Sequence, residues 1–97
     1  MTQRFLLIGT RLPHATVELL QVHQRAEMEL VWRHYASGFI RELYQRAGGA
    51  GVVMILEAAE IEAVAAFADE LPLKQAGLID ITIMPLEPFT MWRALFA

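Results

Sequence analysis

The pattern of hydrophobic and polar positions along the chain predicts four strands and two helices. Apolar runs of four to eight residues, bounded by glycine or proline, are typical of buried strands. Longer stretches with apolar residues every three or four positions are typical of amphipathic helices. The expected strands are 4–10, 39–46, 52–57 and 78–84, and the expected helices are 15–35 and 58–71. The first strand is expected to be central and covered on both faces, and the second to lie at an edge.

The first expected helix carries both an apolar and a polar stripe. Thr16 is placed to cap its first turn, because a hydroxyl there can accept a hydrogen bond from a free backbone amide. Gly38 ends it, since glycine readily adopts the left-handed turn that closes a helix. The expected contact face is the stripe Leu19, Val22, Ala26 and Leu30, and the polar stripe beside it holds His23, Glu27 and His34.

The element order β-α-β-β-α-β predicts a fold class. Right-handed crossovers arrange this order as a ferredoxin-like α+β domain, a four-stranded antiparallel sheet with two helices on one face. Residues 48–51 are the turn of the hairpin between the second and third strands. The chain shows no linker or low-complexity segment, so residues 1–97 are expected to form a single domain. The second face of the sheet remains apolar, which predicts a second copy packed sheet to sheet as a dimeric α/β barrel.

The apolar content points to the same partner. Hydrophobic residues make up 56 % of the 97 positions, above the usual ~45–50 %. The end of the chain, 89–97, is an apolar tail that contains Trp92 and Phe96. Packing of this tail on its own subunit and packing on a neighbouring subunit are both open. A homodimer or a higher homo-oligomer is expected.

Charge and composition exclude several classes of function. The net charge of −3, with scattered arginines, argues against nucleic acid as a partner. The absence of cysteine removes disulfides, thiolate metal sites and a cysteine nucleophile. No signal sequence is recognisable and no apolar run reaches the ~18 residues of a membrane span. The expectation is a cytoplasmic protein that does not bind membranes.

Two stretches carry a resemblance to a known family. One is Leu71-Pro72-Leu73, followed by Gly77-Leu78-Ile79-Asp80-Ile81 and Pro85-Leu86; the other is Gly38-Phe39-Ile40-Arg41-Glu42-Leu43-Tyr44. Together they resemble the muconolactone isomerase-like group of dimeric α/β-barrel proteins. The resemblance implies a homodimer whose sheets form a barrel, with larger assemblies of dimers open. It also implies a pocket between the first helix, the sheet and the partner's tail, and a small-molecule ligand.

The resemblance implies an activity and a pair of residues. Muconolactone isomerases move a proton within a small unsaturated lactone and need no metal or organic cofactor. Their Glu-Lys pair, late in the first helix, falls on Glu27 and Met28 here. Proton transfer next to a carbonyl needs a base and a positive group that stabilises the developing negative charge. Glu27 can be the base, whereas Met28 cannot supply the positive charge.

Other polar residues are candidates on their own chemistry. His23 lies one helical turn before Glu27, so the pair can serve acid–base chemistry or form an ordinary surface pair. Glu27 and His34 are two turns apart and no second ligand cluster follows, so no metal site is predicted. Asp80 is expected on the face toward the dimer barrel, as a base, a substrate anchor or the ion-pair partner of Arg41.

Arg41 is the expected anchor for a substrate carboxylate, although an edge strand also carries such charges without any ligand. Tyr44 is a further substrate-binding candidate, but a regular strand would point it away from Arg41. The leading hypothesis is cofactor-independent proton transfer on a small unsaturated lactone or carboxylated compound, with Glu27 and His23 catalytic. The alternatives are a non-catalytic ligand-binding or assembly module, and a cofactor-free monooxygenase of the same fold with an apolar pocket that Met28, Met54 and Met84 would suit.

Overall fold

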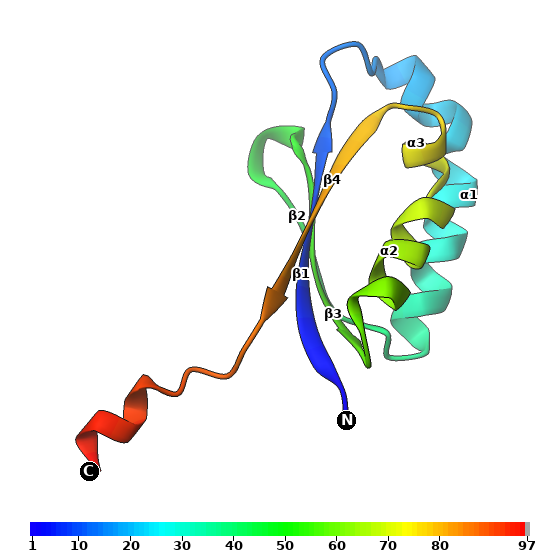
Figure 1. Ribbon diagram of the computed structural model, residues 1–97. Coiled ribbons are helices and arrows are strands. Elements are labelled where there is room, and N and C mark those ends of the chain that lie inside the picture. Colours follow the sequence, from blue (N-terminus) through cyan, green and yellow to red (C-terminus); the bar gives the residue numbers. More distant parts are fainter. Residues whose placement is uncertain (97) are drawn as a thin grey trace.

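The computed structural model describes residues 1–96, and the predicted order of strands and helices is confirmed (Figure 1). The strands are β1 (Gln3–Arg11), β2 (Ile40–Gln45), β3 (Gly51–Ala58) and β4 (Ile79–Leu86). The helices are α1 (Val17–Ala36), α2 (Ile61–Glu70) and α3 (Pro72–Gln75), with 3₁₀ turns η1 (Ala47–Gly49) and η2 (Met91–Leu95). The short α3 lies between the second expected helix and the fourth expected strand, where the sequence predicted no element. Proline starts it because the first position of a helix needs no amide donor.

The four strands form one antiparallel sheet in the order β2-β3-β1-β4. The helices cover one face of this sheet and leave the opposite face bare (Figure 1). This is the predicted ferredoxin-like α+β arrangement. In the register, Leu7 of β1 lies opposite Met54 of β3 and Ile83 of β4. Because side chains alternate along strands, this row defines the helix-covered, inner face of the sheet.

The core lies between the inner face and the helices. Phe5, Leu7, Met54 and Leu56 are fully buried there, against Val64 and other residues of α2. Residues of the alternate rows on the bare, outer face are only partly covered. Within the chain itself, β1 is therefore covered on one face, and the expected cover of its second face stays a prediction. A second layer of protein would be needed to cover the outer face.

Helix α1 packs on a different face from the one predicted. Thr16 caps it as expected, with its hydroxyl accepting a hydrogen bond from the Leu19 amide at 3.2 Å. However, Val22 of the predicted contact stripe is 75 % exposed. Leu30 of the predicted stripe is buried against the sheet, but its buried neighbours are Glu27 and Val31, which lie outside that stripe. The helix is thus rotated so that the polar stripe faces inward, and this rotation carries Glu27 into the interior.

Strand β2 contains an irregularity that changes where its side chains point. Ile40 lies opposite Leu56 and Glu42 lies opposite Ile55, so Arg41 is an extra residue without a partner of its own in β3. Such a bulge reverses the alternation beyond it. Regular alternation would place Ile40 and Leu43 on opposite faces, but the shifted register puts both on the inner face.

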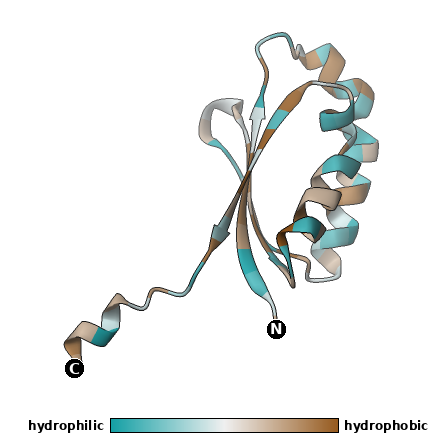
Figure 2. Cartoon of the chain, in the orientation of Figure 1, coloured by the Kyte–Doolittle hydropathy of each residue, from teal (hydrophilic) through white to brown (hydrophobic). Residues whose placement is uncertain are grey.

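The C-terminal tail projects away from the sheet, and no packing on its own subunit is seen for residues 89–96 (Figure 1). Part of this segment carries the brown colour of hydrophobic residues (Figure 2). Its large apolar residues are 61–84 % exposed, namely Phe89, Met91, Trp92, Leu95 and Phe96. A contact between the rings of Phe89 and Trp92, 5.1 Å between centroids, is internal to the tail. Within the described residues, none of the helices combines the length and hydrophobicity that crossing a bilayer requires.

Candidate functional site

A pocket of about 660 Å³ lies between α1 and the β2–β3 hairpin. One wall is the inward side of α1, and another is the η1 turn with the strand ends that flank it. Leu73 of α3 contributes to the lining. The lining residues are Val17, Leu20, Gln21, Gln24, Glu27, Met28, Gln45, Arg46, Ala47, Gly48, Gly49, Gly51, Val52 and Leu73. A volume of this order suits a small organic molecule.

Glu27 is the chemical centre of this pocket. The residue is only 6 % exposed, and its Oε1 atom accepts a hydrogen bond from the backbone amide of Leu73 at 3.0 Å. Burial raises the pKa of the Glu27 carboxyl above its usual value of 4.5, while the Leu73 amide and the charge of His23 act in the opposite direction. Desolvation makes a carboxylate a stronger base, and the amide holds it in one orientation. The arrangement suits a proton acceptor.

The two predicted neighbours of Glu27 are placed differently. His23 lies one turn earlier on α1 and is half-buried, close enough to act on Glu27 through its charge, but it does not line the pocket. Met28 is 52 % exposed and does line it. Of the methionines considered for an apolar pocket, Met54 lies in the core and Met84 on the outer face. Only Met28 contributes to this lining.

Arg46 is a residue of the site that the sequence reasoning missed. It follows the last residue of β2 and is the only positively charged residue among those that line the pocket. Its Nη1 atom donates to the hydroxyl of Thr10 at 2.8 Å and reaches the carbonyl of Gly9 at 3.5 Å. The sequence did contain one indication of this role. Arg46 stands beside the glycine-rich turn, and a long side chain at that position can reach β1.

The glycines of the hairpin shape the pocket wall. Gly48, Gly49 and Gly51 all have positive φ angles, which residues with a side chain rarely adopt. At Gly51 an added Cβ would lie 1.9 Å from the backbone oxygen of Gly9, because β1 and β3 approach there without an intervening side chain. At Gly49 nothing lies within 4 Å of an added Cβ. The predicted turn therefore serves as a wall of the pocket.

The remaining predicted site residues lie on the outer face, away from the pocket. Nε of Arg41 is 3.4 Å from a carboxylate oxygen of Glu57. The phenol of Tyr44 donates to Glu42 Oε1 at 2.9 Å, and this hydrogen bond is the main cause that raises the pKa of Tyr44. The bulge brings Arg41 to the same outer face as Tyr44, which regular alternation would have prevented.

Asp80 lies near the opposite end of the outer face from Arg41. Asp80 is opposite Thr10 of β1, whereas Glu57, the partner of Arg41, is opposite Arg4. Arg4 and Thr10 are separated along the strand by about 20 Å. The predicted ion pair between Arg41 and Asp80 is therefore absent, and neither joins Glu27. The carboxylate of Asp80 instead accepts a hydrogen bond from the Ile81 amide at 3.1 Å.

The other histidines have structural contacts. The ring of His34 packs against Phe39 and Phe67, with centroid distances of 5.3 and 4.9 Å. His14 forms a 2.9 Å hydrogen bond with the carbonyl of Gly77. Across residues 1–96, no three or more His, Asp or Glu side chains gather as a set of metal ligands.

The chain shares its fold with enzymes of known structure. The 5-chloro-2-hydroxyhydroquinone dehydrochlorinase of Burkholderia phenoliruptrix AC1100, in complex with 2,5-dihydroxybenzoquinone, superposes with a TM-score of 0.75 and 18 % identity over 87 % of this chain and 93 % of that chain. Muconolactone isomerase superposes with a TM-score of 0.71 and 24 % identity over 91 % of this chain and 94 % of that chain. No protein-family model matches, and a search of the curated proteins returns no match.

These likenesses confirm the fold that the sequence predicted. The chain is a ferredoxin-like α+β protein with the fold of muconolactone isomerase.

Proposed function

We propose that the protein is a cofactor-independent enzyme that moves a proton within a small unsaturated carbonyl compound, such as a lactone. The observation that carries the proposal is the buried carboxylate of Glu27 in a pocket of ligand size, held by the Leu73 amide. The fold is shared with an isomerase and a dehydrochlorinase, whose names describe reactions on small unsaturated rings.

The chemistry assigned to the pocket has two steps. Glu27 removes a proton from the carbon next to the carbonyl, and the electrons of the C–H bond enter the conjugated system as a dienolate. The same carboxyl then returns the proton to the far carbon of that system, which shifts the double bond and leaves Glu27 ionised. A base with a raised pKa suits both steps, because it accepts the proton and can give it back. His23, through its charge, supports the ionised form of Glu27.

The proposal is tested with α-angelica lactone, whose isomerisation to the conjugated lactone is a shift of one proton. The purified protein is expected to accelerate this shift, followed by proton NMR. Glu27 must be ionised to act, and its pKa lies above 4.5. We therefore expect kcat/KM to be constant at higher pH and to fall about tenfold per pH unit below that pKa. If neither α-angelica lactone nor related butenolides are isomerised faster than in buffer, the proposed reaction is wrong.

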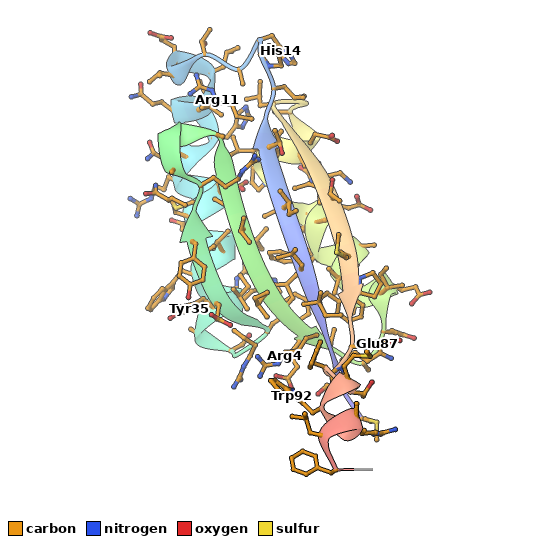
Figure 3. All side chains as sticks on the ribbon, turned by 90° about the vertical axis from the view of Figure 1, so that its left-hand side faces the viewer. Arg4, Arg11, His14, Tyr35, Glu87 and Trp92 are labelled. Carbon is orange, nitrogen blue, oxygen red and sulfur yellow. The ribbon has the colours of Figure 1, made fainter. Side chains whose placement is uncertain are left out.

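We further propose that the subunit assembles into a homodimer or larger oligomer through the outer face of the sheet. The centre of this face is apolar, formed by Leu6, Ile8, Val53, Ile55 and Met84. Charged residues lie at the ends of this face. Arg4 lies at the end where the C-terminal tail, with Trp92, departs from the sheet (Figure 3). An apolar centre with a polar rim is typical of protein interfaces. The exposed tail supports the same proposal, since a neighbouring subunit would cover it.

The assembly is tested by light scattering on a sizing column. The wild-type protein is expected to have a mass of at least twice 11.0 kDa. Leu6→Lys places a charge in the centre of the outer face and is expected to shift the protein toward the monomer, because burying an unpaired charge is costly. Val22→Lys, on the exposed side of α1, adds the same charge and should leave the mass unchanged. A monomeric wild-type protein at micromolar concentration would rule the assembly out.

A further inference from the structure

The charges around the pocket determine which ligands it can accept. Among residues 1–96, Glu27 is the only acidic residue that lines it, and Arg46 is the only basic one. Met28, beside Glu27, contributes an uncharged thioether. An anionic ligand would therefore meet the Glu27 carboxylate in a partly desolvated space, unless Arg46 were free to compensate.

The guanidinium of Arg46 is held against β1. Nη1 of its guanidinium binds the Thr10 hydroxyl at 2.8 Å, and Thr10 lies opposite Asp80 in the sheet. The side chains of Thr10 and Asp80 belong to the outer face, whereas the carboxylate of Glu27 lies on the inner side. Its guanidinium is thus directed across to β1, where its hydrogen bonds are to the Thr10 hydroxyl and the Gly9 carbonyl. Turning it to a ligand would break the contact with Thr10.

The other polar groups of the lining are neutral amides. Gln21 and Gln24 lie one turn apart on α1, and Gln45 ends β2 on the opposite wall. None of the three side chains is hydrogen-bonded to another residue in the part of the chain that the structure describes. Each carries two N–H donors and one acceptor, so they can bind carbonyl and hydroxyl groups. Donors of this kind also stabilise the negative charge that develops on a carbonyl oxygen during proton removal.

We infer that the pocket selects an uncharged ligand with carbonyl or hydroxyl oxygens and disfavours one that carries a carboxylate. The inference rests on the proposed site around Glu27 and narrows its substrate class. Gln21 and Gln24 bind the ligand oxygens in place of a positive group, and Glu27 repels a second carboxylate. The inferred ligand therefore differs from the carboxylated compound that the sequence analysis kept as one of two possible substrates.

The test compares two probes that differ in charge and by one methyl group. Muconolactone carries a carboxylate, and its methyl ester is neutral at pH 7.5. Binding to the wild-type protein is measured by NMR titration of backbone amides, without any need for turnover. The ester is expected to bind at least tenfold more tightly than the acid. Met28→Lys places a positive charge in the lining and is expected to improve binding of the acid at least tenfold, with less than a threefold change for the ester.

Val22→Lys is the matched control, because it adds the same charge to the same helix outside the pocket. It should leave the preference of the wild type unchanged. If the wild type binds the acid as tightly as the ester, or binds neither probe, the inference is wrong. If the ester binds with the expected preference but no lactone is isomerised, the selectivity stands and the proposed reaction fails.

Discussion

Replacing Glu27 with glutamine is expected to lower the rate of α-angelica lactone isomerisation by about 10²–10⁴-fold, the usual contribution of a positioned general base. Glutamine has nearly the same shape, and its carbonyl oxygen can still accept the hydrogen bond from the Leu73 amide. The substitution therefore removes the basic group and keeps the geometry. Turnover is measured by NMR at a pH above the acid limb of the wild-type profile.

Glu29→Gln is the control for this substitution. Glu29 lies on the same helix, is exposed, and pairs with Arg25 at 3.0 Å, so its loss should leave turnover within about twofold of wild type. Equal turnover by Glu27→Gln and wild type would show that the base is another residue.

The stability of Glu27→Gln separates a chemical effect from unfolding. Because burial raises the pKa of Glu27 in the folded state, the folded protein binds more protons than the unfolded one near that pKa. Stability contributed by this group is thus greatest at low pH and falls as pH rises through the folded pKa. Glutamine does not ionise, so the Glu27→Gln variant does not lose stability in this way as pH rises. We expect the variant to be at least as stable as wild type at neutral pH in chemical denaturation.

Replacing Gly51 with alanine is expected to destabilise the fold by roughly 3–5 kcal/mol, at the upper end of single substitutions. Two causes add at this position. The φ angle of +140° is unfavourable for any residue with a side chain, and the new Cβ would lie 1.9 Å from the Gly9 oxygen. Relief of the clash requires β1 and β3 to separate at the pocket wall.

Gly49→Ala is the matched comparison in the same turn. Gly49 also has a positive φ angle, of +75°, but nothing lies within 4 Å of its added Cβ. Gly49→Ala should therefore lower the free energy of unfolding only through the unfavourable φ angle, by about 1–2 kcal/mol. Urea denaturation of both variants measures the difference. Equal destabilisation would show that the Gly9 contact relaxes without cost.

The sequence predicted the fold correctly because the order and spacing of its elements leave few arrangements. The face of α1 was predicted wrongly for a physical reason. Of the stripe that the apolar residues marked, Leu30 is buried but Val22 is exposed, while Glu27 is tolerated inside because a backbone amide from α3 satisfies it. That amide belongs to a helix only four residues long, which periodicity cannot detect.

The candidate site was predicted only in part. Glu27 was found through a family resemblance, and the structure places it in a pocket. Arg41 and Asp80 were grouped with it because their residue types suit substrate binding, but strand register separates them by most of the sheet. Arg46 was missed because its position in the site depends on a contact between its side chain and Thr10 of β1. A pattern of neighbouring residues cannot reveal a contact between distant segments.

The position of β1 in the middle of the sheet bears on how the protein is made. The first strand pairs with β3 and also with β4, which is the last of the four strands in the sequence. Pairing between segments so distant in sequence is slow, since a long loop must close first. The amide that orients Glu27 also comes late, from residue 73. On a ribosome, the nascent chain therefore has α1 and the β2–β3 hairpin before the amide that orients Glu27 has been made.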